Sequence, residues 1–468
     1  ILHALATPND TQYGQQWHYF EARGGLNLPS AWDKARGAGV VVAVIDTGYR
    51  PHADLAANVL PGYDFIKDSG NANDGNARDN NAQDPGDYAT AGACGFLRPI
   101  RDTSSSWHGT HVAGTIAAVS NNGAGVAGVA HEAKVLPVRV RARCGGYTSD
   151  IADGVVWAAG GSVSGVPANP TPARVINLSL GGQGACDTTS QNAVNLARSR
   201  GAVVVVAAGN SNADAAGFSP ASCNGVITVA ATNRNGGRAS YSNYGTRVSV
   251  AAPGGDTASG AANGILSTLN SGSRGPGGDS YAYYQGTSMA APHVAGVVAL
   301  MLSRNPALTP DEVASRLRSS ARAFPATCSG CGSGLVDANA AVDAAGGSTP
   351  PPTGTPDVEP NNTLAAAQAA REGDTIAGTL SATSDVDVFK VAIKAGSTLG
   401  AKLTPNAAAN FDVAILSAGG ATLASSANTG PGVLDATSYR NNGTVTTTYY
   451  VRVTHTGGSA GAYQLVID

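Results

Sequence analysis

Short apolar runs rich in β-branched residues alternate with longer helix-like stretches across residues 38–344 of this chain. The strand-like runs are 39–45, 134–140, 175–180 and 203–207, and the helix-like stretches are 110–119, 149–159, 190–200, 287–304 and 310–321. Short buried strands that alternate with helices are typical of a mostly parallel sheet in an α/β domain. Such domains place their active sites where strands end and helices begin.

The composition changes at residues 346–356, which read GGSTPPPTGTP and lack core-forming side chains. We interpret this segment as a linker. Beyond it, apolar and polar residues alternate with period two, as in 386–393, 449–453 and 463–467, and glycine-rich turns separate these runs. The sequence therefore predicts an α/β domain over 1–345, a linker over 346–356 and a small all-β sandwich over 357–468.

Charge and hydropathy exclude several classes of partner. The net charge is −3 and no basic stripe is present, so we expect no nucleic-acid or membrane-surface partner. No apolar run approaches the length of a membrane span. The chain starts at Ile1 without a leader, which predicts a processed N-terminus.

Six cysteines are present, and they allow fifteen pairings into three disulfides. The CxxC of Cys328 and Cys331 is also compatible with a metal or redox site, but no second CxxC, histidine pair or thioredoxin-like unit accompanies it. The cysteines thus favour structural disulfides, and disulfides indicate an oxidising, extracellular compartment.

Four residues in the α/β region together suit acyl transfer. Asp46 ends an apolar strand, His108 and Ser288 begin helices rich in small residues, and Asn210 follows another apolar strand. A serine nucleophile needs a neutral imidazole to take its proton, and the imidazole needs a carboxylate to fix its tautomer. The oxyanion needs donors, here the Asn210 amide and the Ser288 N–H. Taken singly, each residue also reads as an ordinary turn, core or capping residue.

A neighbouring histidine offers a rival interpretation as a metal pair. His111 lies three residues after His108, but no glutamate lies between them as in the HExxH motif of zinc proteases. We therefore assign His111 to the core.

The segments VIDTG (44–48), HGTHVAG (108–114), AAGN (207–210) and GTSMAAPHVAG (286–296) resemble, in this order, the signature motifs of subtilases. The Asp, His, Ser order is that known for subtilisin. The resemblance covers about residues 1–345. It implies a three-layer subtilisin-like domain with a mostly parallel seven-stranded sheet, a removed propeptide and a secreted, monomeric endopeptidase that acts on polypeptides. Asp46, His108 and Ser288 then form the triad, with Asn210 beside them.

Two other functions remain to be weighed. A catalytically inactive scaffold used for adhesion would not need all four site residues. An esterase would carry the GxSxG elbow around its nucleophile, and the segment around Ser288 lacks that pattern.

The resemblance also implies where a peptide binds. The segment Ser179-Leu180-Gly181-Gly182 resembles the substrate-binding strand, and Gly145 and Gly146 would form the opposite edge, although both segments also read as turns. Ala207, Gly209 and Phe218 are predicted to wall the pocket for the residue before the cleaved bond. Because no acidic residue lies in these segments, we expect a preference for bulky apolar or aromatic side chains.

Structural calcium is a further implication of the resemblance. The expected ligands of one ion are Asp10, Asp54, Val119, Asn122, Ala124 and Val126. The loop 64–87 is rich in Asp and Asn, and it either is a solvated loop or holds a second ion through Asp64, Asp68 and Asp79. The expected disulfides are Cys94–Cys144, Cys186–Cys223 and Cys328–Cys331.

The C-terminal region resembles the bacterial pre-peptidase C-terminal domain in the segments VEPNN (358–362), GTL (378–380), DVDVF (385–389) and YQLV (463–466). The resemblance implies a domain that is often removed during maturation and that aids secretion or substrate adhesion. Asp385 and Asp387 either bind an ion or cap a turn.

Overall fold

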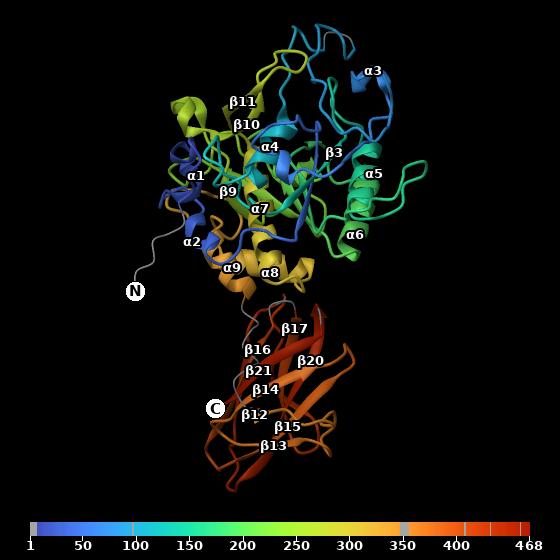
Figure 1. The fold of residues 1–468 in the computed structure, drawn as a ribbon. Helices are drawn as coiled ribbons and strands as arrows, with labels where there is room; N and C mark the ends of the chain where they lie inside the picture. Colours follow the sequence, from blue (N-terminus) through green and yellow to red (C-terminus); the bar gives the residue numbers. More distant parts are fainter. Residues whose placement is uncertain (1–6, 96–97, 347–354, 407–408, 431, 459) are drawn as a thin grey trace. The chain divides into compact units, whose positions relative to one another are not determined.

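The computed structural model describes residues 7–95, 98–346, 355–406, 409–430, 432–458 and 460–468. The chain divides into two compact units, Ile1–Gly346 and Gly347–Asp468 (Figure 1). Each unit has its own sheets and its own hydrophobic core, and each is described by itself.

A seven-stranded sheet forms the centre of the first unit, in the order β2-β3-β1-β4-β6-β8-β9. Every neighbouring pair is parallel, which confirms the predicted α/β fold. The strands are β1 Val41–Asp46, β2 Tyr63–Asp64, β3 Lys134–Arg139, β4 Val175–Leu178, β6 Val203–Ala207, β8 Ile227–Thr232 and β9 Val250–Pro253.

Helices cover both faces of this sheet, because successive strand residues point to opposite sides. In β1, Val42 and Val44 belong to one core cluster, whereas Ala43 and Ile45 belong to another. The first cluster includes α4 His108–Ala117, α7 Thr287–Arg304, α8 Pro310–Ser320 and α9 Ala338–Gly346. The second includes α5 Thr148–Ala158 and α6 Thr188–Ser199.

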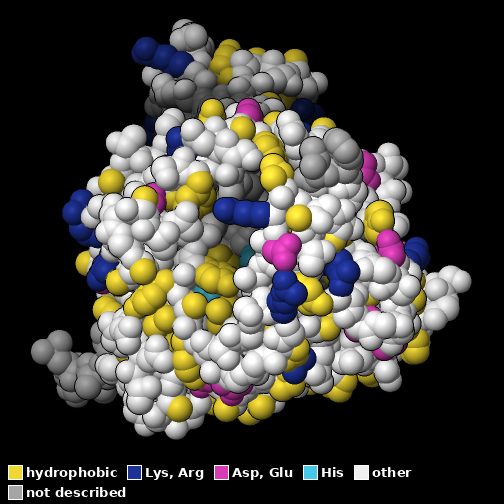
Figure 2. Space-filling model, turned by 90° about the horizontal axis from the view of Figure 1, so that it is seen from above, with side chains coloured by type: hydrophobic (Ala, Val, Ile, Leu, Met, Phe, Trp, Pro, Cys, Tyr) yellow, Lys and Arg dark blue, Asp and Glu magenta, His cyan; other side chains and the backbone are white. Residues whose placement is uncertain are grey.

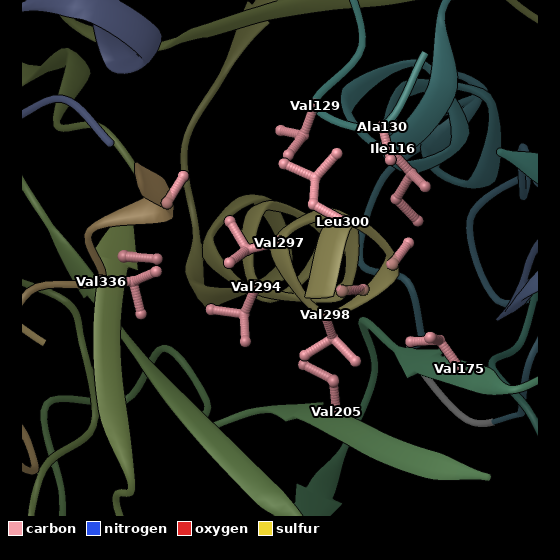
Figure 3. Packing of buried hydrophobic residues seen from close by; sticks show 14 of the residues in the cluster. Ile116, Val129, Ala130, Val175, Val205, Val294, Val297, Val298, Leu300 and Val336 are labelled. Carbon is pink, nitrogen blue, oxygen red and sulfur yellow. The ribbon is translucent and has the colours of Figure 1, made fainter. Parts of the chain in front are cut away.

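Helix α7 runs through the middle of the first cluster. Figure 3 shows Val294, Val297, Val298 and Leu300 on several sides of the helix, each facing apolar side chains of other elements. A helix that is apolar all round has to be buried, and every residue from Met289 to Leu302 is buried. The sheet and α4 therefore fix the start of α7, where Ser288 lies.

Short elements complete the first unit. They are α1 Trp17–Phe20, α2 Leu28–Trp32, α3 Ser69–Ala72, the β5 Gly182–Gln183 and β7 Phe218–Ser219 pair, the β10 Ile265–Asn270 and β11 Asp279–Tyr284 hairpin, and the 3-10 helices η1 Tyr13–Gln15, η2 Ala56–Asn58, η3 Ala215–Gly217, η4 Thr257–Ser259 and η5 Ala261–Asn263. None of the described helices combines the length and the hydropathy that crossing a bilayer requires.

The three disulfides have the expected pairing, namely Cys94–Cys144, Cys186–Cys223 and Cys328–Cys331.

The second unit consists of two five-stranded sheets, in the orders β12-β14-β21-β16-β19 and β13-β15-β20-β17-β18. One core cluster combines Ile376 and Leu399 of the first sheet with Phe389 and Phe411 of the second, so the sheets pack as the predicted sandwich. The strands are β12 Thr355–Pro356, β13 Gln368–Ala370, β14 Thr375–Leu380, β15 Val386–Ile393, β16 Thr398–Pro405, β17 Ala409–Leu416, β18 Thr422–Ser426, β19 Asp435–Arg440, β20 Thr447–Gly458 and β21 Gly461–Ile467.

Candidate active site

A buried carboxylate meets a histidine at the carboxyl edge of the large sheet. Asp46 is the last residue of β1 and is fully buried. Its oxygens lie 2.8 and 2.9 Å from Nδ1 of His108, the first residue of α4. The Thr47 N–H donates to Asp46 Oδ1 at 2.7 Å. The carboxylate therefore holds the imidazole with Nδ1 protonated, which leaves Nε2 as the base.

Two glycines let β1 and α4 approach closely enough for this contact. Gly48 has φ of +94°, and a Cβ there would lie 2.4 Å from the Ala82 carbonyl oxygen. A Cβ on Gly109 would lie 2.0 Å from the Gly48 carbonyl oxygen. A side chain at Gly109 would therefore push α4, which begins with His108, away from the end of β1, and a side chain at Gly48 would collide with the segment that contains Ala82.

The residue before His108 adopts a backbone conformation that is costly for a bulky side chain. Trp107 has φ of +48°, its side chain is buried, and its indole donates to the Gly272 carbonyl at 2.6 Å. The surrounding packing thus imposes a strained conformation next to the histidine, as is common at functional sites.

Ser288 and Asn210 lie together at the start of α7. The Thr287 N–H and hydroxyl both donate to Asn210 Oδ1, at 2.8 and 2.9 Å, so the Asn210 Nδ2 points the other way. A Cβ built on Gly286 would lie 3.5 Å from Asn210 Nδ2 and 3.6 Å from the Ser288 nitrogen. The Asn210 amide and the Ser288 main-chain N–H therefore both border the same small space next to Gly286. Thr287, which orients Asn210, was not singled out in the sequence, although it directly precedes the serine.

The carboxyl end of β4 fixes the main chain of the serine. Asn177 Nδ2 donates to Ser179 Oγ at 2.9 Å, and Ser179 Oγ donates to the Ser288 carbonyl at 2.8 Å. Strand β4 is the neighbour of β1, so the serine and the Asp46–His108 pair lie at adjacent strand ends.

A pocket of about 360 Å³ opens beside Ser288 and Asn210. Its lining includes all the expected residues of the substrate segment and of the pocket wall, namely Ser179, Leu180, Gly181, Gly182, Ala207, Gly209 and Phe218. A second pocket of about 490 Å³ contains Gly145 and Gly146 and shares Leu180, Gly181 and Gly182 with the first. Figure 2 shows a face that is hollowed near its centre, with a Lys or Arg side chain at the margin of the hollow and a histidine visible beside it.

Comparisons with known proteins identify the family of this chain. Residues 37–345 match the subtilase family. The chain belongs to the subtilase family. It is 58% identical over 347 residues to an extracellular protease of Xanthomonas campestris, and 50% identical over 352 residues to an extracellular basic protease of Dichelobacter nodosus. Each alignment covers 74% of this chain but 58% and 57% of the two relatives, so the chain spans little more than half their length. A solved structure of a protease from Pseudoalteromonas arctica matches 73% of this chain and 100% of its own, with a TM-score of 0.71 and 63% identity.

The second histidine of HGTHVAG has a structural role in this subtilase. His111 is fully buried, its Nε2 lies 3.1 and 3.0 Å from the Ile265 and Ala282 carbonyl oxygens, and its ring stacks on Tyr284. Burial lowers the pKa of His111 to about 3, so the ring stays neutral. This confirms its assignment to the core.

The expected calcium ligands of the first site come together around the loop 119–126. Asn122 Nδ2 and the Val126 N–H both donate to Asp54, at 2.6 and 2.8 Å. Asp10 accepts from the Asn121 N–H at 2.9 Å through Oδ2, whereas its Oδ1 is buried without a partner among the described residues. Burial raises the pKa of Asp54, and the nearby charge of Asp10 adds to the rise.

The acidic loop of this subtilase uses its carboxylates within the protein. Asp64 binds the buried Arg139, Asp68 caps α3 through the Gly70 and Asn71 N–H groups, and Asp79 accepts from Asn76 and Asn81. These contacts give no support to the alternative that the loop holds a second ion.

The second unit contains an acidic cluster of Asp357, Glu359 and Asp387, whose ligand oxygens lie within 4.8 Å of one another. Asp385 is not part of it, because its carboxylate accepts from the Ser381 N–H and hydroxyl and so caps a turn.

Proposed function

We propose that this chain is a secreted serine endopeptidase, with Ser288 as nucleophile, His108 as general base and acid, and Asp46 as the group that orients His108. The observation that carries the proposal is that the Asp46–His108 contact at 2.8 Å and the pocket lined by Ser288 and Asn210 lie at the ends of the neighbouring strands β1 and β4. The two relatives named above are called extracellular proteases, which supports both the activity and the secretion.

The proposed reaction starts when His108 Nε2 takes the Ser288 hydroxyl proton as Oγ attacks the peptide carbonyl carbon. The negative charge that develops on the carbonyl oxygen is stabilised by the Asn210 amide and the Ser288 N–H. His108 then protonates the leaving amine, and an acyl-enzyme remains on Ser288. Water, deprotonated by His108, hydrolyses this ester and releases the second product.

The direct test is hydrolysis of casein by the purified chain, together with labelling by a fluorophosphonate, which reacts with activated serines. We expect clearing of casein and a single labelled peptide that contains Ser288. An intact chain that is neither labelled nor active would instead favour an adhesion protein on an inactive scaffold.

Replacing Asn210 with alanine is expected to lower kcat by about 10²–10³-fold with little change in KM. The magnitude is that known for subtilisin when one oxyanion donor is removed, because this contact strengthens only as charge develops. The measurement is kcat and KM on a peptide amide substrate. An Asn192→Ala variant, at an exposed position of α6, is the matched control, and it should retain full activity.

We propose that the pocket beside Ser288 takes a bulky apolar or aromatic side chain from the residue before the cleaved bond. Ala207, Gly209 and Phe218 support this preference, and no Asp or Glu lines the pocket among the described residues. The chain is proposed to act as a monomer after removal of its own propeptide. Strict cleavage after Arg or Lys in a peptide library would contradict the pocket assignment.

We further propose that calcium binds at the loop 119–126, held by Asp10, Asp54 and Asn122 and by the carbonyl oxygens of Val119, Ala124 and Val126. Among the described residues, none donates a hydrogen bond to these three carbonyls, and Asp10 Oδ1 is buried without a donor. Unpaired oxygens beside two carboxylates form the kind of donor set that calcium requires. The ion would brace the loop that follows α4 and so would stabilise the fold.

The acidic cluster of Asp357, Glu359 and Asp387 in the second unit also suits a bound cation, because it combines carboxylates with buried polar atoms that lack a described partner. Asp387 is fully buried and its Oδ1 has no described partner, although Tyr463 donates to its Oδ2. Both amide atoms of the fully buried Asn361 also lack a described partner. Three adjacent carboxylates repel one another unless a cation compensates them.

Calcium removal is expected to destabilise both units. In the Ser288→Ala background, which prevents autolysis, EDTA should lower both transition temperatures and added Ca²⁺ should restore them. A hundredfold excess of Ca²⁺ over its Kd corresponds to about 2.7 kcal/mol of unfolding free energy. Asp54→Asn should abolish the response of the first transition and Asp387→Asn that of the second, so each variant serves as the control for the other. Indifference of a transition to EDTA would contradict the site in that unit.

A further inference from the structure

A positively charged side chain, that of Arg141, lies where the two pockets described above meet. Arg141 lines both the pocket that contains Ser288 and the pocket that contains Gly145 and Gly146. It lies two residues after the end of β3, and its main-chain N–H donates to the Asp46 carbonyl at 3.3 Å. The main chain of Arg141 is therefore anchored to the residue that orients the catalytic histidine.

The guanidinium of Arg141 makes no hydrogen bond or ion pair with any residue that the structure describes. Its two nearest arginines in the chain behave differently, since Arg139 binds Asp64 and Asp74, and Arg143 donates to Asn73. Arg141 is half-buried, so its charge is partly removed from water without compensation from the protein.

No acidic side chain among the described residues that line the two pockets pairs with the Arg141 guanidinium. Asp187 is the one acidic residue in this described lining, and it lines only the second pocket. Its carboxylate accepts from the Ser190 N–H at 2.9 Å and from the Ser190 hydroxyl at 2.8 Å, which caps α6. Hydrogen bonding to the Ser190 N–H lowers the pKa of Asp187, as expected for a capping carboxylate.

We propose that Arg141 determines specificity by binding an acidic side chain of the substrate, on the N-terminal side of the cleaved bond. This inference rests on the proposed function and deepens it. The main-chain groups of Leu180 make no hydrogen bond with described residues, so an extended peptide can pair along this segment. Side chains of an extended peptide alternate in direction. While one fills the pocket beside Ser288, a neighbour faces Arg141, whose planar guanidinium binds a carboxylate through two parallel hydrogen bonds.

The test uses peptides with one aromatic residue before the cleaved bond and with Glu, Gln or Lys at each of the three preceding positions. For the wild type, kcat/KM at one position should be about tenfold higher for Glu than for Gln, and 0.5 M NaCl should reduce this ratio. Arg141→Gln should bring the ratio to about one while retaining hydrolysis of the Gln peptide, and Arg141→Glu should favour Lys. Arg247→Gln, which removes an exposed arginine outside both pockets, is the matched control.

Each outcome decides the proposal. Equal rates for Glu and Gln in the wild type, or a preference that survives in Arg141→Gln, would overturn it. A uniform loss on all peptides in Arg141→Gln would assign Arg141 a structural role and would also overturn it, unless Arg141→Lys restores the Glu preference. If the wild type cleaves no peptide at all, the proposed function fails, and this inference fails with it.

Discussion

Replacing Ser288 with alanine is expected to lower kcat about 10⁶-fold while the protein stays folded. This is the size of loss known for the nucleophile of subtilisin, so it is carried over to this chain by family membership. Ser288 is only partly buried and its side chain makes no hydrogen bond with described residues, so losing the hydroxyl leaves no buried polar group unpaired. The activity should fall with little change in the unfolding free energy.

The measurement combines peptide hydrolysis with thermal unfolding. His108→Ala and the double variant with Ser288→Ala should lose about as much activity as Ser288→Ala alone, because the two groups act in one proton transfer. Additive losses in the double variant would show that His108 and Ser288 work independently, which would contradict the proposed triad. A fluorophosphonate that still labels Ser288→Ala would identify a different nucleophile.

Replacing Asp46 with asparagine is expected to lower kcat by about 10⁴-fold, the order of loss known for this change in another serine protease. Asparagine has nearly the shape of aspartate, so it fits the buried site at the end of β1. Its amide would donate to His108 Nδ1, where the carboxylate now accepts at 2.8 Å. The imidazole would then carry its proton on Nε2 and could not take one from Ser288.

The control for Asp46→Asn is the pH dependence of kcat. Because the variant loses the base form of Nε2, activity should rise when pH is raised far enough for hydroxide to replace the base, whereas the wild type has its own base and should not depend on hydroxide. A loss of less than tenfold, or an unchanged pH profile, would show that Asp46 does not set the tautomer.

The fold class and the four catalytic candidates could be predicted from the sequence because their signals are local. Apolar runs such as 203–207 are short enough for buried strands. Asp46, His108, Asn210 and Ser288 each lie within three residues of the end of a predicted strand or the start of a predicted helix. Strand ends of a parallel sheet share one edge, so residues at these positions approach one another whatever the details of packing. Strands β8 (ITVAAT) and β9 (VAAP) were not predicted from the runs, and only the sheet identifies them, with β8 paired to β6 and β9 paired to β8.

The sequence by itself determined that residues of the types suited to a nucleophile, a base, an orienting acid and an oxyanion donor are present, since motif and spacing record residue type. Only the tertiary structure decided how charged and polar side chains are paired. Asp64 and Asp79 read as possible metal ligands, yet they accept hydrogen bonds from Arg139, Asn76 and Asn81, whereas Arg141 lines the pocket of Ser288 with no side-chain partner in the described part of the chain. The physical reason is that an ion pair depends on which loops meet in space, and a contact such as Arg139 to Asp64 joins residues 75 positions apart.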